Sequence, residues 1–190
     1  MAEKQKNKFT SLFKLIAVCV VIVFCVNIGY AKVSQYLYPK KYQELVEKYA
    51  AEYEISENLL YAVIHTESSF EPDAVSSVGA RGLTQITEDT FDWLLTKTDE
   101  EYTFDDLFTP EISIKYGAYF LSILQNEYFI TETVIAAYHA GMGNVSDWLD
   151  DTRYSDDGQH LKTTPISDTN HYINKVVSAM DKYYNIYNNS

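Results

Sequence analysis

Glu67 is the residue whose place in the sequence most clearly indicates chemistry. Leu60, Val63, Ile64 and Glu67 recur at helical spacing, which puts the carboxylate at the C-terminal end of an apolar helix face. Lost hydration and the negative end of the helix both disfavour the charged form, so we expect a raised pKa. A carboxyl group partly protonated near neutral pH suits general acid catalysis. Alternatively, the same glutamate simply ends the face and reaches water.

Two glycine-containing segments indicate close approach of the backbone to a ligand or to another part of the chain. Four of the seven glycines lie in residues 79–85 and 141–143. Gln85 ends the first segment, and its amide can donate to and accept from the hydroxyl and N-acetyl groups of a sugar. Two ordinary tight turns would have the same glycine content.

The spacing of histidine and cysteine argues against a metal site. The four histidines show no HExxH or similar ligand spacing; they are His65, His139, His160 and His171. Both cysteines, Cys19 and Cys25, precede residue 32, so the rest of the chain has no thiol. We therefore expect no metal, no cofactor and no disulfide.

The elements that position these residues are predicted to be helices joined by loops, so the expected fold class is all-α. Ser56 is a good N-cap for the helix that ends at Glu67, and residues 149–165 form a polar loop. No segment shows convincing strand alternation. The helices are expected after Pro39, after Ser56, from Thr87 or Thr90 through Leu94, after Thr109, from Thr131 to Gly141, and from about Thr169 to Tyr187.

The N-terminus reads as a membrane anchor or a signal helix. Four lysines precede twelve consecutive apolar residues, Leu15 to Val26, and a second apolar run ends at Ala31. We favour an uncleaved single-pass anchor with residues 32–190 on the extracytoplasmic side; secretion after cleavage at Ala31 is the alternative. The expected organisation is a basic tail and anchor in residues 1–31, a linker in 32–44 and one domain in 45–187.

Charge excludes nucleic acid as a partner. The chain of 190 residues has a net charge of −12, and residues 1–31 hold four lysines and one glutamate, a net +3, which leaves −15 on residues 32–190. A duplex-binding protein needs a basic face to displace counterions, and this domain is acidic.

Four motifs resemble the soluble lytic transglycosylase (SLT) domain, in the same order and with similar spacing over roughly residues 45–187. One motif would be weak evidence, but four in sequence are specific. They are Glu67-Ser68-Ser69-Phe70-Glu71-Pro72-Asp73-Ala74, Gly79-Ala80-Arg81-Gly82-Leu83-Thr84-Gln85-Ile86, Ala137-Tyr138-His139-Ala140-Gly141-Met142-Gly143-Asn144 and Asp168-Thr169-Asn170-His171-Tyr172-Ile173.

The resemblance implies a goose-type lysozyme-like helical domain with a substrate groove in a bacterial cell-wall enzyme. Members of the family cleave the β-1,4 bond between N-acetylmuramic acid and N-acetylglucosamine in peptidoglycan and leave a 1,6-anhydro ring. By the same resemblance Glu67 acts first as acid and then as base, with the acetamido group of the substrate assisting at C1. No second acid is obvious in the motifs, since Glu71, Asp73 and Asp147 read as loop or cap residues.

Further roles follow from the resemblance by position. Ser68, Gln85, Tyr138 and His139 match groove residues that bind substrate, and Tyr172 matches the tyrosine that orients the catalytic glutamate. Three residues depart from the usual pattern. Thr84 stands in place of methionine, His139 in place of asparagine and Asp168 in place of glutamate. A smaller residue at 84 would loosen contact with the sugar, and His139 allows a pH-dependent contact.

Three functions remain open from the sequence. A lytic transglycosylase acting on peptidoglycan glycan strands is the first, because Glu67 and Tyr172 are both present. A hydrolytic muramidase on the same fold is the second. A catalytically weak wall-binding module of a conjugation, secretion or other cell-wall machine is the third.

Overall fold

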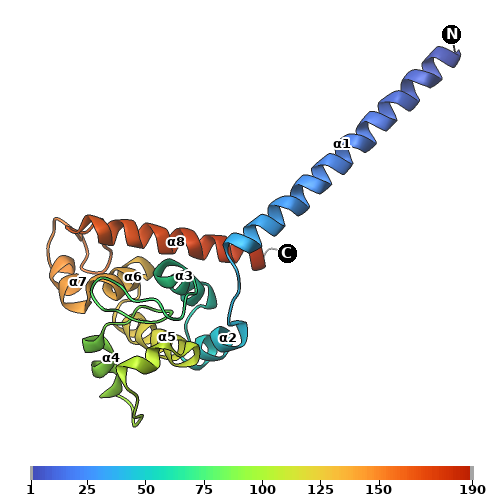
Figure 1. Cartoon of the computed structure of the whole chain (residues 1–190). Helices are drawn as coiled ribbons and strands as arrows, with labels where there is room; N and C mark the ends of the chain where they lie inside the picture. Colours follow the sequence, from blue (N-terminus) through green and yellow to red (C-terminus); the bar gives the residue numbers. More distant parts are fainter. Residues whose placement is uncertain (1, 189–190) are drawn as a thin grey trace. The chain divides into compact units, whose positions relative to one another are not determined.

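The computed structural model describes residues 2–188 of the chain, and side chains within residues 18–26 and 28–188. It divides into two units, residues 1–39 and residues 40–190, each described here by itself. Every regular element in the described part is helical, which confirms the expected all-α class. The first unit is helix α1, Ala2–Leu37, and the second contains all the other helices (Figure 1).

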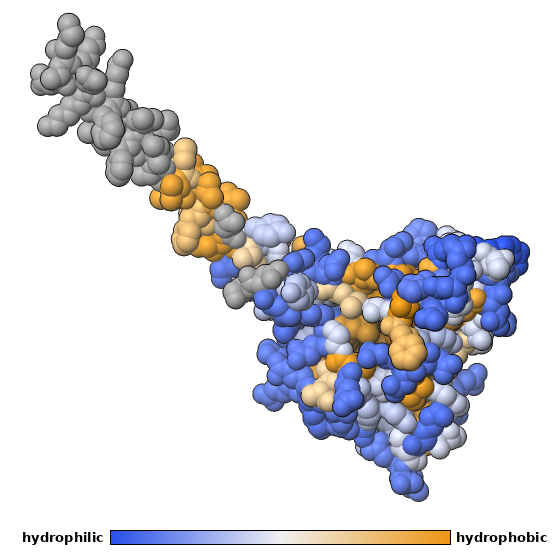
Figure 2. Space-filling view, turned by 180° about the vertical axis from the view of Figure 1, so that it is seen from behind, coloured by the Kyte–Doolittle hydropathy of each residue, from blue (hydrophilic) through white to orange (hydrophobic). Residues whose placement is uncertain are grey.

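Helix α1 is exposed along its apolar stretch. Most side chains between Val18 and Val26 are more than half exposed. They belong to the apolar band of this helix, which is orange in Figure 2. Val18–Leu37 is a stretch of 20 residues with a mean hydropathy of 1.7, long and apolar enough to cross a membrane. Residues 32–37, which we expected in the linker, continue the helix, so only residues 38–42 separate α1 from α2.

The second unit is built around α3, Glu57–Ser68. The Ser56 side chain caps this helix by accepting from the Leu59 amide at 3.4 Å, as predicted. Leu60, Val63 and Ile64 are completely buried, which confirms the apolar face that leads to Glu67. Tyr61 and Ala62 are equally buried, so this helix lies inside the unit rather than on its surface.

The other helices pack on α3 or on its neighbours. They are α2, Gln43–Glu52; α4, Glu88–Leu95; α5, Pro110–Glu127; α6, Thr131–Ala140; α7, Met142–Leu149; α8, Ser167–Tyr187; and the 3-10 helix η1, Phe104–Phe108. Helix α8 packs mainly on α3 and α6, and it runs along that side of the unit in Figure 1. Neither α7 nor η1 was predicted from the sequence. Helix α7 starts directly after Gly141, which ends α6, and has no capping side chain. Helix η1 has five residues, too few for a helical period to stand out.

The loop at residues 69–87 carries the second motif and packs against η1 and α5. Bridges between Val75 and Arg81 and between Arg81 and Ile86 fold it on itself. Gly82 has φ +76° and a Cβ there would lie 2.0 Å from the Leu107 carbonyl oxygen. The backbone therefore needs glycine at this position for close approach to another segment, as predicted. At Gly79, Gly141 and Gly143 a Cβ would meet nothing within 4 Å, so the structure shows no such approach there.

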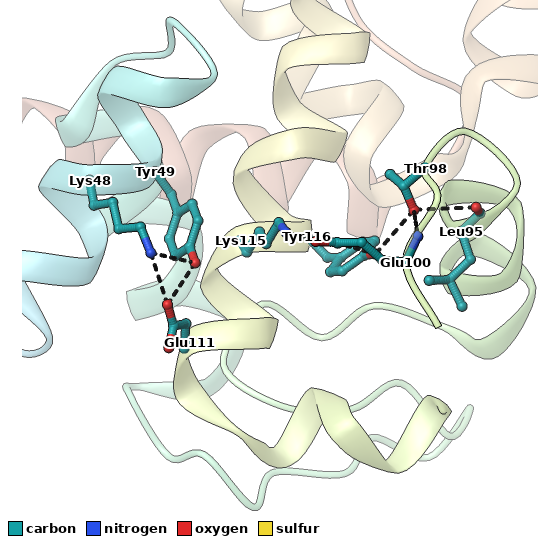
Figure 3. A network of polar contacts seen from close by, with 8 residues as sticks. All are labelled: Lys48, Tyr49, Leu95, Thr98, Glu100, Glu111, Lys115 and Tyr116. Carbon is teal, nitrogen blue, oxygen red and sulfur yellow. Dashed lines mark hydrogen bonds and ion pairs between the residues drawn. The ribbon is translucent and has the colours of Figure 1, made fainter. Parts of the chain in front are cut away.

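Polar contacts on both sides of α5 hold the surrounding segments (Figure 3). Glu111, in the first turn, accepts from Lys48 Nζ at 2.9 Å and from the Tyr49 hydroxyl at 2.8 Å, which ties α5 to α2. Glu100, before η1, pairs with Lys115 and accepts from the Tyr116 hydroxyl at 2.9 Å. The pair of Glu100 and Lys115 is the less exposed of the two ion pairs, so it should contribute more to stability.

Replacing Lys115 with methionine is therefore expected to lower the free energy of unfolding by about 1 kcal/mol at pH 7. The neighbouring Lys115 holds the pKa of Glu100 below its usual value. A carboxyl group whose pKa is lower in the folded chain stabilises the fold at neutral pH and loses this contribution as the pH falls below its pKa in the unfolded chain. The loss of stability caused by Lys115→Met should therefore be smaller in acid. Urea denaturation at pH 7 and pH 3 measures the free energy of unfolding of the variant and of the natural chain. Lys48→Met, at the more exposed ion pair, is the control and should have a smaller effect.

Candidate active site

Glu67 lies in the last turn of α3 and is half-buried. The Tyr172 hydroxyl, from α8, donates a hydrogen bond to Glu67 Oε1 at 2.6 Å. Tyr172 is itself only 7% exposed, so its ring cannot turn away without opening the packing between α3 and α8. Glu67 and Tyr172, the first and last of the predicted site residues in the sequence, are thus in direct contact.

Burial controls the charge of Glu67. Loss of hydration raises its pKa to about 7, and the hydrogen bond from Tyr172 opposes this rise by stabilising the carboxylate. The raised pKa agrees in direction with the sequence prediction. Near neutral pH the group is present in both protonation states, so it can donate a proton in one step and accept one in the next.

A cleft of about 250 Å³ opens over Glu67. Its walls come from the loop at 69–87, from α4 and α5, and from the end of α6. The lining residues are Glu67, Ser76, Val78, Ala80, Gln85, Ile86, Thr87, Thr90, Phe120, Tyr138 and His139. Glu67 is the single carboxylate among these described residues.

The other candidate acids lie elsewhere. Glu71, Asp73 and Asp147 are exposed and do not line the cleft. A glycosidase that uses two carboxylates holds them about 5–9.5 Å apart across the scissile bond. Since no second carboxylate lines the described cleft, the arrangement favours chemistry in which the substrate supplies the second group.

Gln85 and Tyr138 line the cleft as expected, but their polar groups are partly used within the protein. Gln85 has φ +49°, and its Nε2 donates to the carbonyl oxygens of Ala74 at 3.0 Å and Gly82 at 2.9 Å. The amide oxygen is therefore the group of Gln85 suited to bind a ligand. The Tyr138 hydroxyl donates to the Thr84 carbonyl at 2.6 Å, which leaves the oxygen lone pairs and the ring for contact with substrate.

Ser68 does not line the cleft. Its hydroxyl lies 2.8 Å from the Leu83 carbonyl oxygen and 3.1 Å from that of Ile64, and it accepts from the Phe70 amide at 3.2 Å. These contacts join the end of α3 to the loop at 69–87. In this geometry Ser68 holds the loop in place rather than facing the groove.

Thr84 differs from its expected position. The side chain is completely buried, its hydroxyl lies 2.9 Å from the Ser113 carbonyl oxygen, and its methyl group lies against Gly117. It faces α5, not a sugar, so the expectation of a loosened sugar contact is wrong. The part of Thr84 near the cleft is its backbone carbonyl, which accepts from Tyr138.

His139 lines the cleft and stacks on the ring of Tyr172, with centroids 4.5 Å apart and planes 29° from parallel. Its Nδ1 lies 3.2 Å from the Thr169 hydroxyl oxygen. Partial burial lowers the pKa of His139, while the nearby Asp168 acts in the opposite direction. The imidazole is therefore mostly neutral at neutral pH and becomes charged in acid, next to the tyrosine that contacts Glu67.

Replacing His139 with asparagine is expected to simplify the pH profile of activity. In the natural chain, the imidazolium formed in acid favours the carboxylate form of Glu67 and reduces the protonated fraction needed as acid. His139→Asn should remove this loss of kcat on the acid side. The measurement is kcat between pH 4.5 and 8; an unchanged acid limb would rule out His139 as its source. His171→Asn, on the exposed side of α8, is the control.

No group of three histidine, cysteine, aspartate or glutamate side chains converges in the part of the chain that the structure describes. His160 pairs with Asp157, and His171 contacts the backbone of Ser167. His160 and His171 therefore both have hydrogen-bond partners within the protein.

Comparison with known proteins identifies the family. The model of the transglycosylase SLT domain matches residues 44–161. The chain belongs to the SLT-domain transglycosylase family. The match includes Glu67, Gln85, Tyr138 and His139, and Tyr172 follows it in the sequence.

Relatives of this SLT-domain chain are described as membrane-bound lytic murein transglycosylase C. The protein from Serratia proteamaculans is 34% identical over 172 residues, covering 75% of this chain and 46% of the relative. The protein from Yersinia pestis is 39% identical over 116 residues, covering 55% of this chain and 32% of the relative. The chain thus spans about half the length, or less, of the curated relatives it matches.

Solved structures agree on the fold. The 70 kDa soluble lytic transglycosylase of Escherichia coli superimposes with a TM-score of 0.70 and 26% identity, over 80% of this chain and 25% of that one. An inactive mutant of the Pseudomonas aeruginosa lytic transglycosylase gives a TM-score of 0.69 at the same identity and coverage. The SLT-like helical fold expected from the motifs is confirmed.

Proposed function

We propose that this chain is a lytic transglycosylase of peptidoglycan that cleaves the β-1,4 bond between N-acetylmuramic acid and N-acetylglucosamine and leaves 1,6-anhydro ends. The observation that carries the proposal is a single cleft carboxylate, Glu67, with a pKa of about 7 and a hydrogen bond from Tyr172. Family membership and the described relatives support it.

Glu67 serves both steps of this reaction. In the first, protonated Glu67 gives its proton to the glycosidic oxygen as the bond to C1 breaks, and the acetamido oxygen of the substrate bonds to C1. In the second, the Glu67 carboxylate takes the proton of the muramyl 6-hydroxyl, whose oxygen bonds to C1 and displaces the acetamido group. Water is not consumed, and Glu67 ends protonated as it began.

The remaining cleft residues bind and orient the sugars. Tyr172 holds the carboxylate in one direction, and the Gln85 amide oxygen can accept from a sugar hydroxyl or acetamido group. Tyr138 and Phe120 supply aromatic surface. The Tyr138 hydroxyl in turn fixes the loop that carries Gln85 through its bond to Thr84.

We also infer that α1 anchors the enzyme in the bacterial membrane with residues 40–188 on the cell-wall side. The exposed apolar stretch and the lysines before it support this orientation, and the relatives are described as membrane-bound. The alternative is that the same helix is a cleaved signal sequence. Cell fractionation tests this: a retained anchor keeps the full-length chain in the membrane fraction, and a cleaved signal sequence does not.

Product analysis tests the activity. Peptidoglycan digested by the purified chain is analysed by mass spectrometry. Muropeptides with anhydro-muramyl ends, each one water lighter than a reducing end, are expected. Reducing ends would indicate a hydrolytic muramidase, and undigested wall would indicate a module without activity; either result contradicts the proposal.

A further inference from the structure

A row of aromatic rings leads out of the cleft along α4 and α5. Phe120 lines the cleft beside Tyr138, with ring centroids 5.1 Å apart. Trp93 meets Phe120 edge to face, at 6.2 Å and 78°. Thr90, one helical turn before Trp93, also lines the cleft. Trp93 therefore lies just beyond the cleft wall, two ring contacts away from Tyr138.

Lys97 lies on this outermost ring. Its Nζ is 4.5 Å from the centroid of Trp93, within the range of a cation–π interaction. Trp93 is 36% exposed and Lys97 is exposed, so the ammonium stays open to solvent while the ring holds it near one place. We call these two residues the Lys97 site.

The Lys97 site carries a positive charge on a domain whose net charge is negative. The ion pairs of residues 40–188 involve Lys40, Lys48, Arg81, Lys115, Arg153, Lys162 and His160. Four lysines of the described residues 40–188 form no ion pair there: Lys41, Lys97, Lys175 and Lys182. Of these, Lys97 is the one held by a ring that contacts a cleft residue, in a chain with 27 acidic and 15 basic residues. Its positive charge is thus available to an anion from outside.

The proposed substrate offers anions of one kind. Its sugar hydroxyl and acetamido groups are neutral, whereas the short peptides carried by the muramyl lactyl groups bear carboxylates. A strand lying in the cleft meets a domain of strongly negative charge, which repels those carboxylates. One exposed cation beside the cleft would then favour the strand positions that bring a carboxylate to it.

We propose that the Lys97 site binds a carboxylate of the stem peptide on a sugar next to the cleaved bond, and so gives the enzyme a preference for strands with charged peptides. This inference rests on the proposed function. The Lys97 ammonium pairs with the carboxylate, and the Trp93 ring packs against the apolar part of the peptide while holding the ammonium in position.

The test compares two substrates with the full chain in detergent. One is soluble, peptide-bearing glycan strands, and the other is the same strands after chemical amidation of their carboxylates. The ratio of kcat/KM between the first and second should be about threefold to fivefold for the natural chain and should fall as salt is added. Lys97→Met and Trp93→Leu should bring the ratio to one or below, because the negative domain repels the carboxylates, while Lys97→Arg should keep the natural ratio.

Lys182→Met is the matched control, since it removes an equal charge from an exposed position on α8 that does not line the cleft. It should keep the natural ratio. A natural ratio of about one, or an unchanged ratio in Lys97→Met or Trp93→Leu, would overturn the proposal. Absence of anhydro ends from both substrates would instead refute the proposed function, so the two failures are distinguishable.

Discussion

Glu67→Gln is expected to reduce the rate of anhydro-muropeptide release by at least about a thousandfold. Glutamine has nearly the same shape and can still accept from Tyr172, but it can neither give a proton to the glycosidic oxygen nor take one from the 6-hydroxyl. Both steps of the proposed reaction lose their only carboxylate among the described cleft residues. Initial rates of muropeptide release, followed by mass spectrometry, measure the loss.

The stability of the same variant separates lost chemistry from lost folding. Burial raises the pKa of Glu67 from its usual 4.5 to about 7, so the folded chain holds this proton more tightly than the unfolded chain does. The carboxyl group therefore destabilises the fold increasingly as pH rises from about 4.5 to 7, and by about 3 kcal/mol above pH 7. Glu67→Gln should unfold at higher denaturant concentration than the natural chain at pH 8 and at nearly the same concentration at pH 4.

The control for both measurements is Glu71→Gln. Glu71 is exposed, lies four residues further along and does not line the cleft. Its replacement should leave both the rate and the unfolding transition nearly unchanged. A Glu67→Gln enzyme that releases anhydro ends at the natural rate would contradict the proposed role of Glu67.

Tyr172→Phe is expected to lower kcat by about tenfold to a hundredfold and to shift the alkaline limb of the pH profile upward. The Tyr172 hydroxyl stabilises the carboxylate form of Glu67, so its removal raises the pKa of Glu67 further. The group then stays protonated to higher pH as an acid, but its carboxylate loses the bond that orients it. The measurement is kcat from pH 5 to 9.

A merely structural role for Tyr172 would lower activity without moving the pH limb, and that result would contradict the assignment. Tyr184→Phe provides the comparison because Tyr184 lies on the same helix and is 51% exposed. It should change neither kcat nor the pH profile.

Much of the fold could be read from local signals. Ser56 caps α3, Pro110 begins α5, and the polar residues 149–165 form a loop before α8, each as the sequence predicts. Each of these depends on the geometry of a few neighbouring residues, which the sequence states directly. Helix α7 has no capping side chain at its start, so it lacked such a signal. Helix η1 has one that was not recognised, the capping box of Thr103 and Asp106.

The direction of side chains in the loop at 69–87 could not be predicted in this way. Thr84 belongs to the second motif, yet its side chain is buried against Ser113 and Gly117. Ser68, at the end of α3 just before this loop, bonds to the Leu83 carbonyl. Which side of an irregular loop faces a cleft depends on the helices that pack against it. Neither helical nor strand periodicity applies there.

The place of Glu67 at the end of an apolar helix face follows from residue order alone, because the helical period of 3.6 residues sets which side chains share a face. Its contact with Tyr172, 105 positions along the chain, depends on how α8 packs against α3. The same packing removes water from the carboxylate and leaves it without a second acid among the described cleft residues. Burial and long-range neighbours are properties of the assembled helices, since desolvation requires surfaces from segments that the sequence holds far apart.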